Sequence, residues 1–250
     1  MNNYAGLEAE LYDEFWRDEL DDVAFYLDFV REKGGRALDL GCGTGRVLIP
    51  LRKAGLDVVG LDPAPEMLEI CRRNAAAAGV TVALHCARME EFEFDEGFNV
   101  LLIPAFSFQL VHPVDVAAKA LANFHRHLLP GGALVLSVFV PSVHEGEDGQ
   151  GDWHLRKEVV RTSDGARIEC RQANRFDLLN RMLHVQNRYS VFDATGQQID
   201  AQLAEMDIQW HDPDDLAAML HDAGFNDVTI LGDDEPGDDG NATLLFIATA

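Results

Sequence analysis

The chain has 250 residues, of which 43 are Asp or Glu and 20 are Lys or Arg, so its formal net charge is −23. Such a surplus of negative charge opposes attraction to nucleic acid and to anionic membranes, and neither partner is expected. The N-terminal residues show no basic region followed by an apolar stretch, and no run of about 18 apolar residues occurs. We therefore expect a cytoplasmic protein with one sizeable core.

Neither the cysteines nor the acidic clusters predict a metal site. The cysteines lie far apart in the sequence and form no Cys-x-x-Cys pair, which favours reduced, mostly buried thiols over a zinc site. Residues 233–239, with the sequence DDEPGDD, are expected to form an exposed acidic loop.

Apolar runs alternate with helical periodicity along most of the chain, after an N-terminal helical segment that ends near Glu32. Strands are expected near 36–40, 57–61, 80–85, 98–103, 133–140, 225–231 and 243–249. Helices are expected near 45–54, 65–78 and 114–128, and from Asp212 to Gly224. This order predicts an α/β fold with a doubly wound, mostly parallel seven-stranded sheet and ligands at the carboxyl ends of its strands.

The pattern changes between residues 141 and 209. Residues 167–177, 182–192 and 198–208 alternate as successive strands do, and turn-forming pairs separate them. We predict an inserted antiparallel β layer at 141–209, within a core formed by 1–140 and 210–250.

The sequence LDLGCGTGR, residues 38–46, joins the first strand to the following helix. Its glycines let the backbone turn tightly and pass close to a ligand. Asp39, just before them, would repel a pyrophosphate but suits a ligand that carries an ammonium and a sulfonium. Asp62 ends the second strand, at the spacing expected of an acid that accepts hydrogen bonds from both ribose hydroxyls.

Four segments, in order, resemble the class I S-adenosylmethionine-dependent methyltransferases. The glycine segment is similar to their first motif, and residues 58–68 (VVGLDPAPEML) to their second strand with its ribose acid. Residues 98–111 (FNVLLIPAFSFQLV) resemble the fourth strand and the loop that lines the acceptor site, and residues 127–139 (HLLPGGALVLSVF) the fifth strand. The resemblance implies a Rossmann-like methyltransferase fold closed by an antiparallel hairpin, with S-adenosyl-L-methionine as cofactor. The inserted layer would then cover the acceptor site, as in small-molecule members.

The resemblance also implies which residues bind the cofactor. The methionine part is expected beside the backbone of Gly41, Cys42 and Gly43. Asp39 would favour its ammonium, directly or through water, and Asp62 would hold the ribose. Adenine is expected among Met67, Ala87, Arg88 and Met89, although the family commonly places an acid where Arg88 stands. Arg17 would hold the cofactor carboxylate and Tyr12 would cover the cofactor. The same site would be lined by Pro63 and Pro104.

Gln109 and His112 follow the fourth strand and are predicted as catalytic residues that touch the acceptor. Close relatives often follow the SFQ stretch with histidine, where this chain has Leu110. Whether a general base is used therefore stays open, because only an acceptor that is protonated at neutral pH needs one.

Basic residues gather in the predicted inserted layer. Residues 153–188 hold eight Lys or Arg against four Asp or Glu. These bases either pair with acids elsewhere, on the same chain or across a homodimer, or they bind an anionic acceptor. In the second case Arg171, Arg175 and Arg188 would line the acceptor pocket. The chain is expected to be a monomer or a homodimer.

Three function classes remain. The favoured one is methyl transfer from S-adenosylmethionine to N, O or C of a small metabolite. The second is a cofactor-binding regulatory or scaffold protein without turnover. The third, a nicotinamide-dependent oxidoreductase, is opposed by Asp39 and by the glycine spacing.

Overall fold

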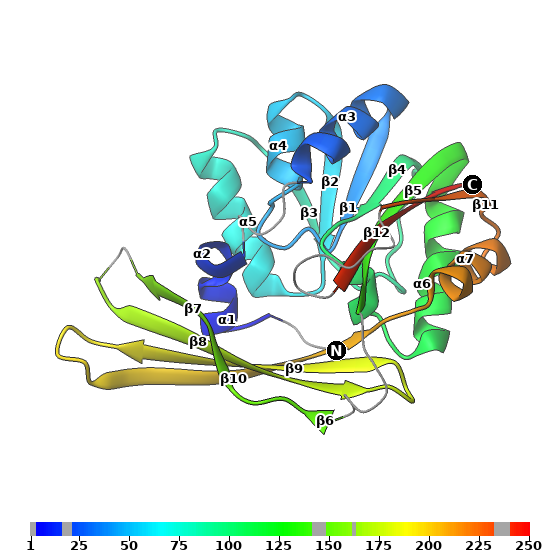
Figure 1. Cartoon of the computed structure of the whole chain (residues 1–250). Helices are drawn as coiled ribbons and strands as arrows, with labels where there is room; N and C mark the ends of the chain where they lie inside the picture. Colours follow the sequence, from blue (N-terminus) through cyan, green and yellow to red (C-terminus); the bar gives the residue numbers. More distant parts are fainter. Residues whose placement is uncertain (1–3, 17–21, 142–148, 162–163, 233–240) are drawn as a thin grey trace.

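The computed structural model describes residues 4–16, 22–141, 149–161, 164–232 and 241–250, and these form two sheets with helices around one of them (Figure 1). The larger sheet has seven strands in the order β11-β12-β5-β4-β1-β2-β3. Its strands are β1 (Arg36–Leu40), β2 (Asp57–Asp62), β3 (Ala83–Cys86), β4 (Phe98–Ile103), β5 (Leu128–Pro141), β11 (Asn226–Leu231) and β12 (Asn241–Thr249). β12 runs antiparallel to both β5 and β11, and the other pairs are parallel. The predicted fold class is confirmed.

Helices cover both faces of this sheet. α3 (Val23–Lys33), α4 (Leu48–Lys53) and α5 (Pro65–Ala77) pack into one core, and α6 (Val114–His127) and α7 (Pro213–Asp222) into the other. Proline at the first helical position starts α5 and α7, and a glycine with positive φ follows each of these helices, Gly79 and Gly224. None of the described helices combines the length and the apolar character that crossing a membrane requires.

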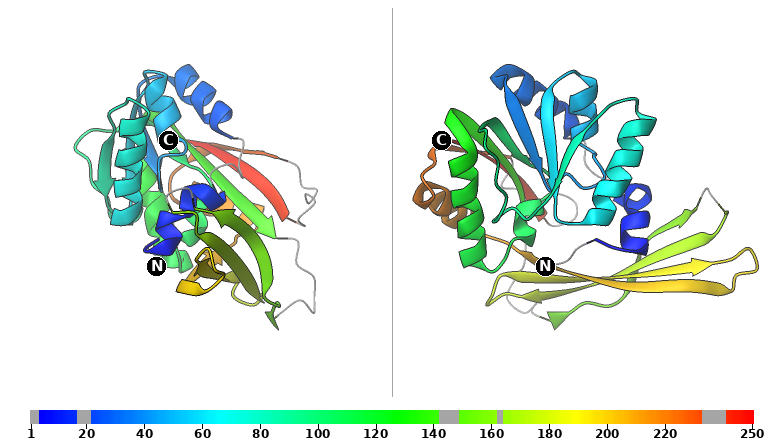
Figure 2. Two further views of the ribbon diagram at one scale, coloured as in Figure 1. Left: turned by 90° about the vertical axis from the view of Figure 1, so that its left-hand side faces the viewer. Right: turned by 180° about the vertical axis from the view of Figure 1, so that it is seen from behind.

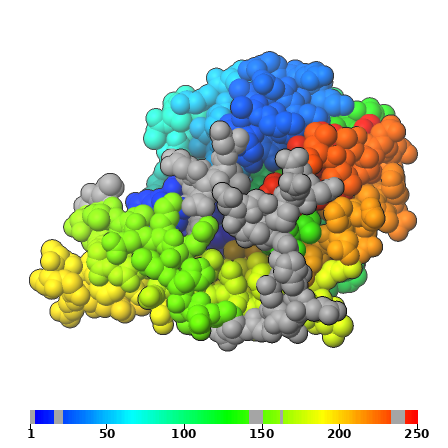
Figure 3. All heavy atoms as spheres, viewed as in Figure 1, coloured from blue at the N-terminus to red at the C-terminus, as the bar shows by residue number. Residues whose placement is uncertain are grey.

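The second sheet has five strands and is antiparallel throughout. Its strands are β6 (Gly149–Gln150), β7 (His154–Val160), β8 (Arg167–Asp177), β9 (Met182–Phe192) and β10 (Gln198–Gln209). Three of them were predicted to within one residue. β7 was missed because its sequence, HLRKEVV, places charged residues along an exposed strand. The alternation of apolar and polar residues that indicates a strand is therefore hard to see. The inserted sheet forms the lower part of the molecule in Figures 1 and 3.

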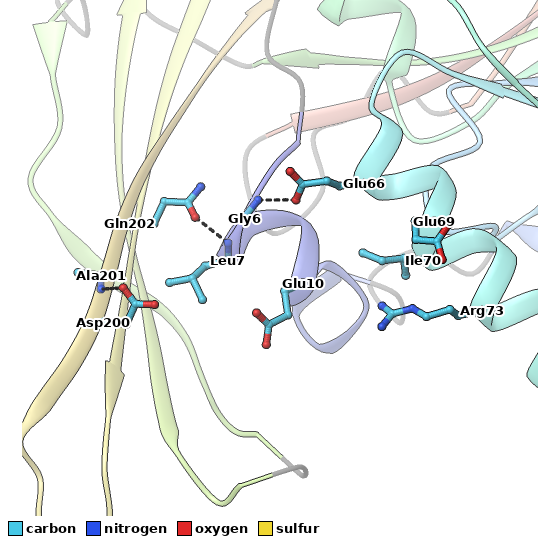
Figure 4. Close-up of a pocket in the computed structure, with 10 residues that line it drawn as sticks. All are labelled: Gly6, Leu7, Glu10, Glu66, Glu69, Ile70, Arg73, Asp200, Ala201 and Gln202. Atoms are coloured by element: carbon cyan, nitrogen blue, oxygen red, sulfur yellow. Dashed lines mark hydrogen bonds between the residues drawn. The ribbon is translucent and has the colours of Figure 1, made fainter.

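The N-terminal segment is not one long helix. It divides into α1 (Leu7–Glu10), α2 (Tyr12–Trp16) and α3, and the first two lie between the sheets (Figure 2). The start of α1 is tied to both sides, because the N–H of Gly6 donates to Glu66 on α5 (2.7 Å) and the N–H of Leu7 to Gln202 on β10 (2.6 Å; Figure 4). The residues that form these bonds line an open groove, and no residue of the glycine turn lines it.

Apolar contacts complete this link. Leu11 and Phe15 are buried against Ile168 and Tyr189 of the inserted sheet, and the rings of Phe15 and Tyr189 meet edge to face at 5.8 Å. The N-terminal helices therefore attach the inserted sheet to the rest of the fold.

Replacing Phe15 by Ala should destabilise the attachment of the inserted sheet. The ring is fully buried, and removing such a ring costs about 3–5 kcal/mol. Urea denaturation would measure this loss, with Phe29→Ala, a partly buried residue of α3, as the control. A loss no larger than that of the control would contradict the proposed attachment.

Candidate active site

The glycine turn is held by the end of β2. The N–H groups of Gly41 and Cys42 both donate to the carbonyl of Leu61, at 2.8 and 3.0 Å. The Asp62 carboxylate accepts from the N–H of Gly43 (2.9 Å) and from the N–H of Ala64 (2.8 Å). Burial raises the pKa of Asp62 to about 6, and these two bonds oppose that rise. One carboxylate thus fixes the turn and the start of α5 together.

A cavity lies against this turn. Eight of the predicted cofactor residues line it: Tyr12, Gly41, Gly43, Asp62, Pro63, Met67, Arg88 and Met89. The lining residues that the sequence did not predict are Tyr4, Ala64, Glu90, Ala105, Ser107, Leu110 and Val111. A side chain at Gly41 would lie 2.9 Å from Ser107, and φ there is +74°, so the position requires glycine.

Other predicted cofactor residues do not line this cavity. Cys42 is buried in the core as a free thiol close to that of Cys71, and its backbone N–H already donates to the carbonyl of Leu61. Pro104 is buried, and Ala87 packs against the core that contains α6. These residues were assigned from their positions in the sequence, which do not show where each side chain points. Arg17 lies outside the described residues.

Asp39 is buried behind the turn, with 1% of its surface exposed. Neither carboxylate oxygen has a hydrogen bond of good geometry within the described part of the chain. Burial raises its pKa to about 7, which the guanidinium of Arg46 opposes and the nearby Asp62 reinforces. A ligand cation close to the turn would relieve this unpaired acid.

At the other end of the cavity, Arg88 forms an ion pair with Glu90 (3.6 Å). The Glu90 side chain is 9% exposed, and one of its oxygens is buried without a hydrogen-bond partner in the described structure. An acid thus lies in the cavity wall two residues after Arg88. The sequence Arg88-Met89-Glu90 contains this acid and was the feature that could have indicated its position.

The predicted catalytic residues, Gln109 and His112, line neither this cavity nor the one next to it. The Gln109 side chain is fully buried, and both ends of its amide bond to the backbone of Phe139 on β5, each at 2.9 Å. Gln109 therefore anchors the loop after β4 instead of reaching the acceptor. His112 lines neither this cavity nor the next, and burial lowers its pKa.

A second cavity, of about 420 Å³, lies between the two sheets. It shares Tyr4, Tyr12, Ala105 and Leu110 with the first, so the two cavities adjoin. Apolar side chains supply much of its wall: Phe106, Phe139, Leu183, Val185, Met206 and Ile208. Its polar side chains include Glu8, Arg156, Gln172, Asn174 and Asn187.

The arginines predicted to bind an anionic acceptor do not line this cavity. Side chains alternate between the faces of a strand, and the cavity is lined by Gln172, Asn174 and Asn187, so Arg171, Arg175 and Arg188 have the opposite direction. Arg188 instead stacks on Trp153, 4.7 Å from its ring centre. Other members of the basic cluster pair with acids, as the alternative interpretation had it: Arg161 with Glu10 and Asp164, Arg167 with Glu158 and Glu169, and Arg181 with Asp212 and Asp215.

Comparison with known proteins agrees with this geometry. Residues 37–132 match the family model described as a methyltransferase domain. Demethylmenaquinone methyltransferase of Thermus thermophilus is 37% identical over 128 residues, which are 50% of this chain and 54% of that protein. The dTDP-4-amino-2,3,4,6-tetradeoxy-D-glucose N,N-dimethyltransferase of Saccharopolyspora spinosa is 28% identical over 140 residues, 53% of this chain and 55% of that protein. The chain thus spans about half the length of these curated relatives.

Solved structures match over almost the whole chain. The sugar N-methyltransferase of Streptoalloteichus sp. superposes with a TM-score of 0.73 at 25% identity, covering 100% of this chain and 96% of that one. With the match of residues 37–132 to a methyltransferase domain, this shows that the chain has the fold of the class I S-adenosylmethionine-dependent methyltransferases. S-adenosylmethionine is the cofactor of that class, and the buried acids beside the turn fit its cationic and hydroxyl groups. The described residues form no cluster of His, Cys, Asp and Glu that could hold a metal ion.

Replacing Asp62 by Ala should weaken S-adenosylmethionine binding more than tenfold, because two charge-assisted hydrogen bonds of about 1.5–3 kcal/mol each would be lost. The wild-type affinity should also decline as the pH falls through about 6, where the carboxylate takes up a proton. Calorimetry would test both effects, with Asp57→Ala at the exposed end of the same strand as control. Equal affinity of the Asp62 variant and wild type would exclude the ribose role.

Replacing Asp39 by Asn should stabilise the cofactor-free protein at pH 8. Folded Asp39 keeps its proton up to about pH 7, whereas the unfolded chain releases it near pH 4. The folded state binds more protons between these values, so wild-type stability falls as the pH rises through this range. Thermal unfolding at pH 5 and pH 8 would show the difference, with exposed Asp28→Asn as control. A variant less stable than wild type at pH 8 would contradict this account.

Proposed function

We propose that this protein transfers a methyl group from S-adenosylmethionine to nitrogen, oxygen or carbon of a small metabolite. The observation that carries the proposal is the shared wall of the two cavities. A cofactor on the glycine turn and an acceptor between the sheets would meet at Tyr4, Tyr12 and Leu110. Methyl transfer needs mainly this alignment and the exclusion of water.

The cofactor would supply an electrophilic methyl group, and each part of the first cavity would hold part of it. The backbone at Gly41 and Gly43 lies beside the expected methionine part, Asp39 would favour its ammonium, and Asp62 would accept from the ribose. Glu90 would take the place of the acid missing at Arg88 and accept from the adenine amino group.

In this proposal residues 141–209 cover the acceptor site of a core formed by 1–140 and 210–250. The names of two relatives indicate methylation of sugar nitrogen, so a sugar amine is the acceptor that we favour. If the acceptor also carries an anionic group, Arg156 is the base of the predicted cluster that lines the acceptor cavity. A cytoplasmic location and a monomeric or homodimeric state stay predictions.

The test is to incubate the purified protein with methyl-labelled S-adenosylmethionine and a panel of small metabolites. We expect a labelled small product together with an equal amount of S-adenosylhomocysteine, and a large loss of both in Asp62→Ala. Stoichiometric cofactor binding without transfer to any member of the panel would favour the regulatory or scaffold alternative.

A further inference from the structure

Glu8 is a buried acid that faces the acceptor cavity. It lies on α1, is 6% exposed and lines the space between the two sheets. Acids are rarely this buried unless a cation pairs with them, yet no Lys or Arg of the described structure forms an ion pair with Glu8. The fold thus maintains a desolvated carboxyl group where an acceptor would bind.

Two amides of the inserted sheet orient this carboxyl group. The Gln172 side chain donates through Nε2 to Oδ1 of Asn187, at 3.0 Å. The Asn187 side chain lies close enough to Glu8 to favour its charged carboxylate. Because the Asn187 oxygen accepts from Gln172, its NH₂ group is the end left to interact with Glu8. All three side chains line the cavity.

Aromatic rings lie next to the carboxylate. Tyr4 and Tyr12 meet edge to face at 5.4 Å, and both line the two cavities. Glu8 is close enough to raise the pKa of each tyrosine, although burial is the main cause of both shifts. A carboxylate beside aromatic rings stabilises an ammonium group, through charge and through the negative faces of the rings. A neutral hydroxyl group would gain much less.

The other side chains near the acceptor offer no base. Leu110 is apolar, and Gln109 and His112 do not line the cavity. Tyrosine and arginine stay protonated near neutral pH. Among the described lining residues, Glu8 is the group that can exchange a proton there, since burial raises its pKa to about 7.

We propose that Glu8 is a catalytic residue that binds the ammonium group of an amine acceptor and takes its proton. This inference rests on the proposed methyl transfer. The acceptor R–NH₃⁺ gives one proton to the Glu8 carboxylate and becomes a free amine. The nitrogen lone pair then forms the new N–CH₃ bond while the S–CH₃ bond breaks, and that bond's electron pair stays on sulfur, leaving a neutral thioether. The product nitrogen carries the positive charge.

The first test compares two probes of equal shape, cyclohexylamine and cyclohexanol, bound to the complex with S-adenosylhomocysteine. Wild type should bind the ammonium probe at least tenfold more tightly at pH 8. Glu8→Gln should abolish the preference and leave S-adenosylhomocysteine affinity unchanged, which also shows that the variant is folded. Glu10→Gln, on the same helix but paired with Arg161 outside this cavity, should keep it. Equal binding of both probes by wild type, or a preference that survives in Glu8→Gln, overturns the inference.

The second test measures transfer to dTDP-4-amino-2,3,4,6-tetradeoxy-D-glucose and to its 4-hydroxy counterpart between pH 5.5 and 9. S-adenosylmethionine is kept saturating throughout this range, so that the titration of Asp39 and Asp62 at the cofactor site does not affect the comparison. We expect transfer to the amine, with kcat/KM falling below about pH 7. Glu8→Gln should lower kcat about 100-fold and remove that pH dependence. The titratable groups that Glu8 influences are Tyr4, Tyr12 and Cys170, and burial raises the pKa of each above its usual range, so none of them titrates in the lower half of this range. Transfer to the hydroxyl compound alone would overturn the role of Glu8 and leave the proposed function standing. An ammonium preference that depends on Glu8, with no transfer to either compound or to the metabolite panel, would support the ammonium site and overturn the proposed function.

Discussion

The site depends on the two hydrogen bonds that the Asp62 carboxylate accepts from the backbone. Parallel pairing of β1 with β2 brings their carboxyl ends together, which places Asp62 beside the glycine turn. Its bonds to the N–H groups of Gly43 and Ala64 then hold the turn open next to the start of α5. A carboxylate that orders the glycine turn is already positioned to receive hydroxyl donors, so the same side chain serves folding and recognition.

The acceptor side depends on a different constraint, the attachment of the N-terminal helices to the inserted sheet. Leu7, Leu11 and Phe15 are spaced by four residues and pack on that sheet. Tyr4, Glu8 and Tyr12 have the same spacing and line the cavity. In α1 and α2 this is the spacing of helices with two different faces, and Tyr4 lies just before α1. The sheet buries one face and thereby directs the other toward the acceptor site.

This contrast explains how much the sequence could predict. The glycine turn, Asp62 and Met67 were found because short local segments determine where they lie. Glu8 was not found, since its direction depends on an inserted sheet that lies more than a hundred residues away in the chain. Arg171 was assigned to the pocket from charge alone. Successive side chains of a strand point to opposite faces of the sheet, so charge does not show which face Arg171 is on. Packing against the rest of the protein decides which face of a strand lines the cavity, and counting charges gives no information about packing.

Electrostatics joins the two halves of the site. Burial raises the pKa of Asp39, Asp62 and Glu8 alike, to about 7, 6 and 7, so the cofactor-free site holds acids whose charged forms are costly. Cationic ligands on both sides would relieve that cost. Methyl transfer to an amine would move one positive charge from sulfur to nitrogen, away from the glycine turn and toward Glu8. Glu8 would already have taken the proton of the amine at that point, so its contribution is to present the nitrogen with a free lone pair beside the methyl group before the transfer begins.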